Sequence, residues 1–399
     1  MTAVLVYALS LVVAVLVSSL AQRTVLSTAV LFLASGFLVG DGVLGLVVLR
    51  PDDPVVGVLV EIALFTVLFT DGMQAGLRDI ASAWRLPGRA LLLGLPLTLL
   101  AVAAGAHWVV GLPWLQALLV GAALSATDPV LAAALIGHED VPRRLRHLLN
   151  VESGLNDGLA LPIVLVLIAV LGRRDSHLGG LLGEAVLGVV LGIVVPWVVV
   201  RLERTRLFGA APRYEALLVF AIGLLLFAGG SLAHANLFLA AFAGGATVAT
   251  VSTTMRQAFH EFGEKLTELL KLAALLVFGA LMSPSFLAEI PWSGYLFAVL
   301  VLVLARPLAL AFALLGSELD WREWVAAAWF GPKGFASVVY GLLILHSAVD
   351  GGDLMFHLIA LVTVLSVVAH SSTDVLVARW FRRVADEEAG GRQAPASCR

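Results

Sequence analysis

Residues 152–158 read ESGLNDG and stand at the head of a long apolar run. Ser153 and Asp157 are four residues apart, as are Glu152 and Asn156, so each pair shares one face of a helix. A carboxylate inside a membrane is costly, about 2.5–3.5 kcal/mol on insertion scales, and usually marks a functional site. Either a proton or a cation removes that cost by neutralising the charge. Competition between H⁺ and a cation for Asp157 is therefore a sufficient mechanism for exchanging one against the other.

The oxygen atoms near this carboxylate suit a small hard cation such as Na⁺. They belong to Asp157, to the Ser153 hydroxyl, and to backbone carbonyls near Thr127, where a predicted helix is broken. Glu152 and Asn156 border the same predicted ion site. Glu152 is assigned to a structural ion pair with Arg306 in LVLARPLAL, because an arginine well inside a predicted span needs a partner. Asn156 is expected to fix the geometry through hydrogen bonds.

The whole chain has the composition of a membrane protein. Its 399 residues are 60% hydrophobic and 13% charged, with a mean hydropathy of +1.00, whereas soluble domains are about 45–50% apolar and about 25% charged. A spanning helix needs about 20 mostly apolar residues, and about thirteen segments meet that criterion. We therefore predict an all-α polytopic membrane protein with spans at residues 2–20, 24–41, 54–71, 87–107, 112–136, 147–171, 178–200, 213–233, 236–252, 268–284, 292–315, 322–346 and 353–378.

The two ends of the chain add little to this prediction. The chain is apolar from residue 3 without a basic leader, so we interpret its start as the first membrane helix rather than a cleaved signal. Cys398 is the single cysteine, which leaves no partner for an internal disulfide and no cysteine-based metal site.

Arginine and lysine in the connections predict the orientation of the spans. They concentrate after the odd-numbered spans and in the tail: Arg78, Arg85, Arg89, Arg143, Arg144, Arg146, Arg201, Arg204, Arg206, Arg213, Arg256, Lys265, Arg379, Arg382 and Arg383. The even connections are nearly free of cations, apart from Arg50 and the pair Arg173 and Arg174. The odd connections are therefore predicted to face the cytoplasm of a plasma membrane, with the N-terminus outside and the C-terminus inside.

The spans can be grouped into two inverted repeats of about six helices each, on either side of a linking seventh span. Spans five and twelve are counterparts under this scheme, and both are interrupted. The first contains Asp128-Pro129 in LSATDPVLAAAL, and the second contains GPKG at residues 331–334. Proline and glycine disfavour helix at these points. Matched discontinuous helices that cross near mid-membrane predict a transport site.

Two crossing broken helices would point partial charges at one another, roughly half a charge at each end. Asp128 is predicted to offset the positive N-terminal ends and Lys333 the negative C-terminal ends. We also expect Asp128 to reach the ion through water. Two nearby charges are given no function: Asp71 is interpreted as a helix-end charge, and Lys271 as a side chain that extends to the membrane surface from the start of its span.

These motifs resemble those of the monovalent cation:proton antiporter-1 family, the bacterial sodium/proton antiporters related to eukaryotic sodium/hydrogen exchangers. The resemblance covers almost the full membrane portion and rests on LFTDGMQAGL (68–77), SATDPV (125–130), ESGLNDG (152–158), ARPL (305–308) and GPKG (331–334). It implies a homodimer in which a core bundle moves against a dimerisation part.

Carried over to this chain, the resemblance divides one transmembrane unit, residues 1–378. The core bundle would comprise residues 87–171 and 292–378, and the dimerisation part residues 1–71 and 213–284. Residues 178–200 would be the linking helix. Residues 379–399 would form a short cytoplasmic tail, and we expect its part DEEAGGRQAPASCR, residues 386–399, to be disordered.

The same resemblance implies roles for the site residues. Asp157 would carry the ion and the proton, with Ser153, Asp128 and the Thr127 carbonyl around the ion, and Glu152–Arg306 would be the stabilising ion pair. An Asn-Asp pair, here Asn156 and Asp157, resembles that of electroneutral one-for-one exchangers. Lys333 departs from the arginine of many relatives, and lysine lacks the planar guanidinium group.

The predicted function is exchange of Na⁺ or Li⁺ for H⁺ by a secondary antiporter. Exchange of K⁺ for H⁺ through the same site remains open as the alternative. A cation channel is less favoured, because the sequence contains no filter-like repeat and no gating-charge helix. Ser153 has no evident base and no GxSxG elbow, and no P-loop is present, so we expect no enzyme activity. We expect no cofactor, nucleic acid or obligate soluble partner, only lipid and a second copy.

Overall fold

The computed structural model describes residues 2–21, 27–41, 43–51, 53–74, 86–128, 135, 141–172, 178–205, 208–347 and 349–392. Within these ranges the chain forms helices and connections and no β-strand. The α-helices are α1 (Thr2–Ala21), α2 (Thr28–Val39), α3 (Pro54–Gln74), α5 (Leu86–Arg89), α6 (Leu95–Gly105), α7 (Trp114–Ala123), α9 (Arg143–Leu171), α10 (Leu178–Glu203), α11 (Glu215–Leu232), α12 (Leu237–Val251), α13 (Thr253–Leu281), α14 (Pro284–Glu289), α15 (Trp292–Leu300), α16 (Arg306–Ala313), α17 (Trp321–Trp329), α18 (Phe335–His346) and α19 (Gly352–Arg392). Shorter turns are π-helical at η1 (Ala90–Gly94), η2 (Ala106–Val110) and η5 (Val301–Ala305), and 3₁₀ at η4 (Pro212–Tyr214).

A helix occupies each span predicted from the apolar runs, which confirms the all-helical membrane class. Among the described residues, 7 helical segments are long and apolar enough to cross a membrane. α3, for example, has 21 residues, and at about 1.5 Å per residue it matches the roughly 30 Å hydrocarbon core. α13 begins at Thr253 rather than at residue 268. Its first half carries charged residues, so a prediction based on apolar runs does not include that part.

The interruptions predicted in spans five and twelve are present. α7 is followed by the non-helical residues 124–128, and the non-helical residues 330–334 separate α17 from α18. The two breaks touch, because the Asp128 N–H donates a 2.8 Å hydrogen bond to the Pro332 carbonyl oxygen. An unwound backbone inside a membrane needs such partners from protein or water. The contact therefore stabilises both breaks at once.

Two helices contain a π-helical turn that the sequence pattern did not predict. η1 lies directly before α6, whose second residue is Pro96, and η5 lies directly before α16, whose second residue is Pro307. Proline has no N–H to donate, so the regular hydrogen-bond ladder is interrupted at both points. These helices are counterparts in the predicted inverted repeat, and α6 packs against α16. The shared irregularity supports the repeat.

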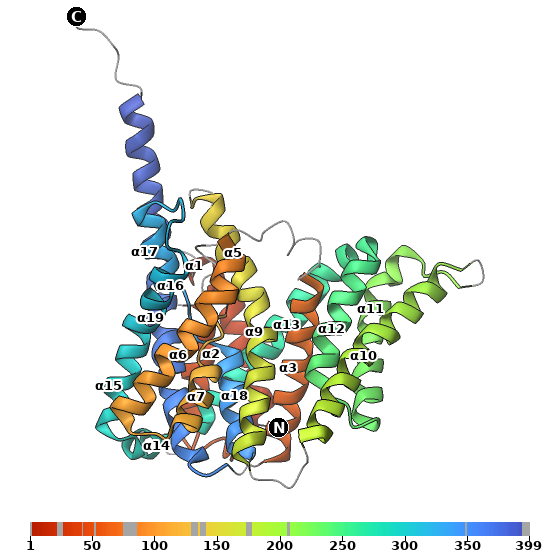
Figure 1. The fold of residues 1–399 in the computed structure, drawn as a ribbon, viewed down its shortest axis with the longest axis horizontal. Helices are drawn as coiled ribbons and strands as arrows, with labels where there is room; N and C mark the ends of the chain where they lie inside the picture. Colours follow the sequence, from red (N-terminus) through yellow and green to blue (C-terminus); the bar gives the residue numbers. More distant parts are fainter. Residues whose placement is uncertain are drawn as a thin grey trace, which may run out of the picture.

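The helices pack in two groups. In one group α12 packs against α3, α10 and α11, and α13 packs against α2 and α3. In the other, α7 contacts α6 and α9, while α19 contacts α15 and α18. Figure 1 shows α10 to α12 on one side of the molecule and α15, α16 and α19 on the other. Contacts of α3 with α9 and of α13 with α18 join the groups, and the candidate site lies there.

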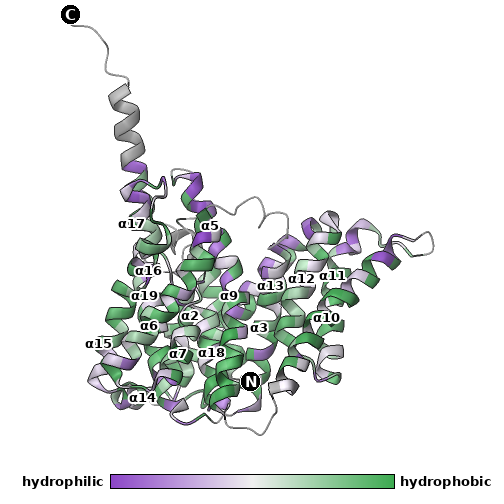
Figure 2. Cartoon of the chain, in the orientation of Figure 1, coloured by the Kyte–Doolittle hydropathy of each residue, from purple (hydrophilic) through white to green (hydrophobic). Residues whose placement is uncertain are grey.

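The connections rich in arginine lie at one end of the bundle. Arg256 donates a 2.8 Å hydrogen bond to the Gln74 carbonyl oxygen, and Arg144 pairs with Glu323 at 2.7 Å. These contacts join the connections after spans three and nine, and those after spans five and eleven. α19 leaves the bundle at this end, and the N-terminus lies toward the other end (Figure 1). Figure 2 shows hydrophobic residues along the sides of the helices and hydrophilic residues gathered near their ends.

The last helix is longer than predicted. α19 continues to Arg392, so residues 386–392 are helical and the expectation of disorder is wrong for them. Alanine, glutamate and arginine in this stretch are good helix formers, which outweighs the loss of apolar surface. Several residues used in the sequence predictions lie outside the described ranges: Arg78, Arg85, Pro129, Arg173, Arg174, Arg206 and Cys398.

Candidate ion-binding site

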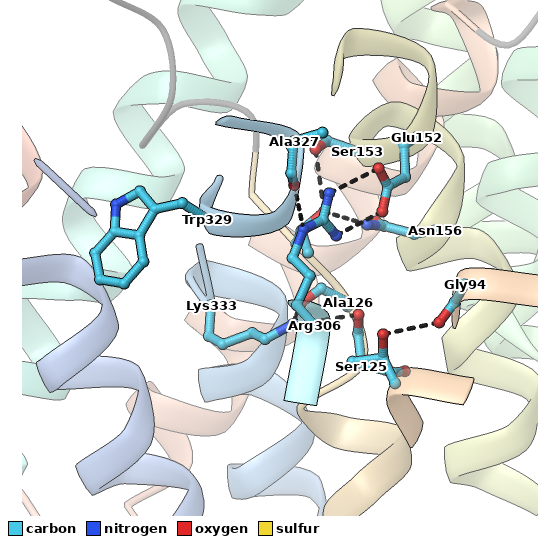
Figure 3. A network of polar contacts seen from close by, with 12 residues as sticks. Gly94, Ser125, Ala126, Glu152, Ser153, Asn156, Arg306, Ala327, Trp329 and Lys333 are labelled. Atoms are coloured by element: carbon cyan, nitrogen blue, oxygen red, sulfur yellow. Dashed lines mark hydrogen bonds and ion pairs between the residues drawn. The ribbon is translucent and has the colours of Figure 1, made fainter. Parts of the chain in front are cut away.

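Glu152 of α9 and Arg306 of α16 face each other inside the bundle (Figure 3). Arg306 donates two hydrogen bonds to the Glu152 carboxylate, of 2.6 and 2.8 Å, and a third of 2.9 Å to the Ala327 carbonyl oxygen. Glu152 is 5% exposed and Arg306 is 6% exposed, so each charge depends on the other rather than on water. The pair joins α9, α16 and the end of α17 directly beside the break.

Thr127, Ser153 and Asn156 form a hydrogen-bonded group between the break after α7 and helix α9. Thr127 Oγ1 lies 3.0 Å from Ser153 Oγ, and the Asn156 amide donates to Thr127 Oγ1 over 2.5 Å. Asp157 follows on α9 and is only 3% exposed. Among the described residues, neither Asp157 Oδ1 nor Asn156 Oδ1 has a hydrogen-bond partner, although both atoms are buried. Such oxygen atoms suit a proton or a hard cation.

Tyr340 of α18 adds a contact that the sequence did not indicate. Its hydroxyl donates a 3.0 Å hydrogen bond to the backbone carbonyl oxygen of Asp157, and its side chain is fully buried. The bond fixes α9 against α18 at the position of the carboxylate. Because it uses the backbone oxygen, it leaves the carboxylate itself open to a ligand.

Asp128 and Lys333 lie where the break at residues 124–128 meets the break at residues 330–334, which we call the crossing. Each lies beside the helix end whose partial charge it was predicted to offset. Asp128 Oδ2 accepts a 3.2 Å hydrogen bond from the N–H of Phe335, the first residue of α18. Lys333 Nζ donates to the carbonyl oxygens of Ser125 and Ala126, at 3.4 and 3.3 Å, just beyond the C-terminal end of α7 (Figure 3). An anion thus stands at a helix N-terminus and a cation at a helix C-terminus, where each is stabilising.

Helix α19 holds the break between α17 and α18 through residues that the sequence did not indicate. The Lys333 N–H donates a 2.6 Å hydrogen bond to Ser366 Oγ, which lies 3.0 Å from His370 Nδ1. His370 Nε2 lies 2.9 Å from the carbonyl oxygen of Trp329, the last residue of α17. His370 Nδ1 also lies 2.8 Å from the Ser366 carbonyl oxygen, so the imidazole ring contacts α19 on one side and the end of α17 on the other. One chain of hydrogen bonds then spans the break.

Two charged residues that were given no function from the sequence are buried at the site. Lys271 is 6% exposed, and its Nζ lies 3.3 Å from Asp128 Oδ1. The prediction that it extends to the membrane surface is wrong, because α13 begins well before the predicted span and places Lys271 inside the helix. Asp71 lies in the last turn of α3, as predicted for a helix-end charge, but it is buried rather than exposed. Its buried charge interacts electrostatically with those of Lys271 and Asp157.

The described part of the chain lacks the usual ligand set of a divalent-metal site. Within the described ranges, no group of three or more His, Cys, Asp and Glu side chains is placed to hold a metal ion. A Ca²⁺ site usually takes about 6–8 oxygen ligands with several carboxylates among them. Asp157 is instead accompanied by neutral hydroxyl and amide groups.

A cavity of about 240 Å³ opens at the end of the bundle that carries the arginine-rich connections. Its lining includes Thr70 of α3 and Arg256 and His260 of α13. Thr70 precedes the buried Asp71 and accepts a 3.0 Å hydrogen bond from Thr267. The cavity thus approaches the carboxylates of the site between α3 and α13.

The chain matches the family described as sodium/hydrogen exchanger, transmembrane, over residues 8–380. The protein belongs to the sodium/hydrogen exchanger family. This membership confirms the resemblance drawn from the sequence motifs and places the chain among transporters rather than enzymes. The sodium/hydrogen exchanger match covers both halves of the bundle, including the two breaks and α9.

Curated relatives are similar to this protein over most of the chain. The K⁺/H⁺ antiporter NhaP2 of Shewanella sp. (strain MR-4) is 27% identical over 387 residues, covering 94% of this chain and 66% of that protein. The K⁺/H⁺ antiporter NhaP of Alkalimonas amylolytica is 26% identical over 389 residues, covering 96% and 67%. The chain therefore spans about two thirds of the length of these relatives.

The fold of this protein is shared with a solved structure. The sodium proton antiporter MjNhaP1 from Methanocaldococcus jannaschii aligns with a TM-score of 0.76 and 20% sequence identity, over 95% of this chain and 98% of that chain. At this identity the likeness shows a common fold. It agrees with the all-helical architecture predicted from the apolar segments.

Gly334→Ala is expected to destabilise the crossing. A Cβ atom at this position would lie 2.5 Å from both Cβ and Oδ2 of Asp128, so either Asp128 or the break must move. Overpacking of this kind lowers the free energy of unfolding by about 1–3 kcal/mol. The measurement is the melting temperature of the detergent-solubilised protein. Gly57→Ala in α3 is the matched control, because no atom lies within 4 Å of its added Cβ; equal melting of the two variants would contradict the tight contact.

Proposed function

We propose that the protein is a secondary antiporter that exchanges a monovalent cation for H⁺, with both ligands competing for Asp157. The observation that carries this proposal is the buried Asp157 Oδ1, which accepts no hydrogen bond from the described residues, beside two broken helices that touch. Discontinuous helices are where secondary transporters bind their substrates. The carboxylate needs one positive partner, and a bound proton excludes a bound cation.

In this proposal each neighbour of Asp157 has a separate role in binding the cation. Ser153 and Thr127 supply neutral oxygen atoms to the cation, and Asn156 orients Thr127 through its 2.5 Å hydrogen bond. Asp128 acts through water, because its own oxygen atoms already contact Phe335 and Lys271. Glu152 and Arg306 hold the frame, and Lys333 offsets the end of α7. The roles of Asp157, Ser153, Asp128, Glu152 and Arg306 follow those implied by the family resemblance, and the roles of Asn156 and Lys333 follow those predicted from the residues themselves.

The buried charges at the crossing support a one-for-one exchange. Four carboxylates face three cationic side chains there: Asp71, Asp128, Glu152 and Asp157 against Lys271, Arg306 and Lys333. With all of these groups ionised, the cluster holds one excess negative charge, which one proton or one monovalent cation neutralises. A second cation would leave an uncompensated charge in an interior that stabilises charge poorly. The proposed exchange is therefore electroneutral.

The proposed cation is Na⁺ or Li⁺, in line with the oxygen ligands and the family description. K⁺ is the second candidate, because the relatives from Shewanella and Alkalimonas are named K⁺/H⁺ antiporters. Both candidates use the same carboxylate and the same neutral oxygen atoms.

Alternating access is proposed to occur by movement of the core, residues 87–171 and 292–378, against residues 1–71 and 213–284. The latter part would form a homodimer, with residues 178–200 as the linking helix. The packing of the helices in two groups that meet at α3, α9, α13 and α18 supports this division. The arginine-rich end is assigned to the cytoplasmic side of the plasma membrane, with the N-terminus outside and the C-terminus inside.

The proposed function is tested with the purified protein in liposomes that contain a pH-sensitive dye. Addition of Na⁺, Li⁺ or K⁺ is expected to move protons in the opposite direction, with a clear preference among the cations. An imposed membrane potential is expected to leave the rate unchanged, because no net charge moves. Absence of cation-driven proton movement with all three cations would overturn the proposal, and a rate that follows the potential would overturn the one-for-one stoichiometry.

A further inference from the structure

Lys271 and Asp128 form a buried ion pair that the exchange mechanism above does not use. Lys271 Nζ lies 3.3 Å from Asp128 Oδ1, and the two residues are each 6% exposed. The other Asp128 oxygen, Oδ2, accepts the hydrogen bond from Phe335 at the start of α18. Lys271 also interacts electrostatically with Asp71 and Asp157. Its ammonium group is therefore a positive charge placed among the carboxylates of the ion site.

The pair also joins the two groups of helices. Lys271 belongs to α13, which packs against α2 and α3, whereas Asp128 lies in the break after α7. A cavity of about 10 Å³ lies beside the pair, lined by both residues, by Ala29 of α2, and by Gly334 and Phe335 at the start of α18. This volume is about that of one water molecule. The contact is thus narrow and lies where the core is proposed to slide.

We propose that Lys271 is a tethered cation of the transport site, whose charge opposes binding of the transported cation at Asp157 and whose contact with Asp128 ties α13 to the crossing. This inference rests on the proposed function. A cation beside Asp157 repels the ammonium group, because like charges in a poorly solvated interior interact strongly. Binding of the cation therefore weakens the Lys271–Asp128 contact. Lys271 sets the affinity for the cation and couples its binding to release of the core.

A purely structural ion pair makes a different prediction. If Lys271 only neutralised Asp128, its removal would lower stability and the amount of active protein without changing the cation concentration at half-saturation. A tethered cation instead lowers affinity by its charge, so its removal must strengthen cation binding. The concentration at half-saturation separates the two roles.

The test compares Lys271→Gln with the wild-type protein in dye-loaded liposomes, at the alkaline end of the activity range, where proton competition is weakest. We expect the half-saturating cation concentration to fall about tenfold, because one positive charge near the site is gone, and the maximal rate to fall, because the cation leaves more slowly. Lys265→Gln is the matched control on the exposed part of α13. Lys271→Arg retains the charge and is expected to retain the wild-type affinity within about threefold.

An unchanged or raised half-saturating cation concentration in Lys271→Gln would overturn the inference. In that case, exchange by the wild-type protein would still support the proposed function. Failure of the wild-type protein to exchange any cation would instead overturn the proposed function. If Lys271→Gln does not fold, Lys271→Met removes the same charge and keeps most of the side-chain volume. We expect the half-saturating cation concentration to fall about tenfold in this variant as well, and an unchanged or raised concentration would overturn the inference.

Discussion

Asp157→Asn is expected to abolish cation/proton exchange while the protein still folds. Asparagine has nearly the same shape, and the hydrogen bond from Tyr340 goes to the backbone oxygen of residue 157, so the packing of α9 against α18 survives. The attraction lost for a cation at about 4 Å is about 4 kcal/mol at an effective dielectric constant of about 20. That corresponds to roughly a thousandfold in affinity. The measurement is dye-reported exchange in liposomes after Na⁺, Li⁺ or K⁺ addition.

The control for this experiment is Asp41→Asn, because Asp41 is an exposed aspartate in the connection between α2 and α3. It is expected to exchange at the wild-type rate. Folding of Asp157→Asn is checked by its melting temperature and its elution as a single species. Full exchange by a well-folded Asp157→Asn protein would remove this residue from the mechanism and, with it, the competition on which the proposal depends.

Arg306→Ala is expected to lower the free energy of unfolding by about 3–5 kcal/mol, the range measured when one partner of a buried ion pair is removed. The variant removes both hydrogen bonds to the Glu152 carboxylate. It also removes the hydrogen bond from Arg306 to the Ala327 carbonyl oxygen. It also opens space next to Gly331, whose added Cβ would lie 2.1 Å from Arg306 Cδ. The measurement is the melting temperature and the yield of the detergent-solubilised protein.

A double variant separates the loss of the charge balance from the loss of packing. Arg306→Met combined with Glu152→Gln removes both charges and keeps most of the side-chain volume, so it is expected to melt well above Arg306→Ala. Replacement of both ions of a buried pair is often close to neutral. Arg306→Ala protein that melts at the wild-type temperature would show that the pair does not hold α9, α16 and α17 together.

Much of the site could be predicted because its markers are local. Proline and glycine interrupt a helix wherever they stand, so the breaks near Asp128 and at residues 331–334 follow from the chain itself. Likewise, a charged residue in the middle of an apolar run must find a partner, and the single arginine deep in its span, Arg306, pointed to Glu152. Ser153, Asn156 and Asp157 lie close together in the sequence, so one helix turn is enough to place them on the same side of the bundle.

The site residues that were assigned wrongly or not predicted have partners that are distant in the sequence. Asp71 and Lys271 were assigned to membrane edges, because a count of apolar residues ends each span where charges begin. Lys271 instead lies well inside α13, and Asp71 is buried although it stands in the last turn of α3. Tyr340, Ser366 and His370 have no local marker at all, since an apolar helix tolerates a single hydroxyl or imidazole group without revealing what it contacts.

By itself, the sequence determined that the chain is a helical membrane protein and where its helices break. It also indicated which connections share an end and which carboxylate is proposed to exchange a proton for a cation. These features depend on composition and on neighbours within a few turns of helix. Only the tertiary structure decided that Lys271 pairs with Asp128, that Asp71 joins the site, and that α19 supports the break. Such choices depend on which helix faces pack together, because a buried charge is stabilised by whatever partner lies across the contact and not by its position in the chain.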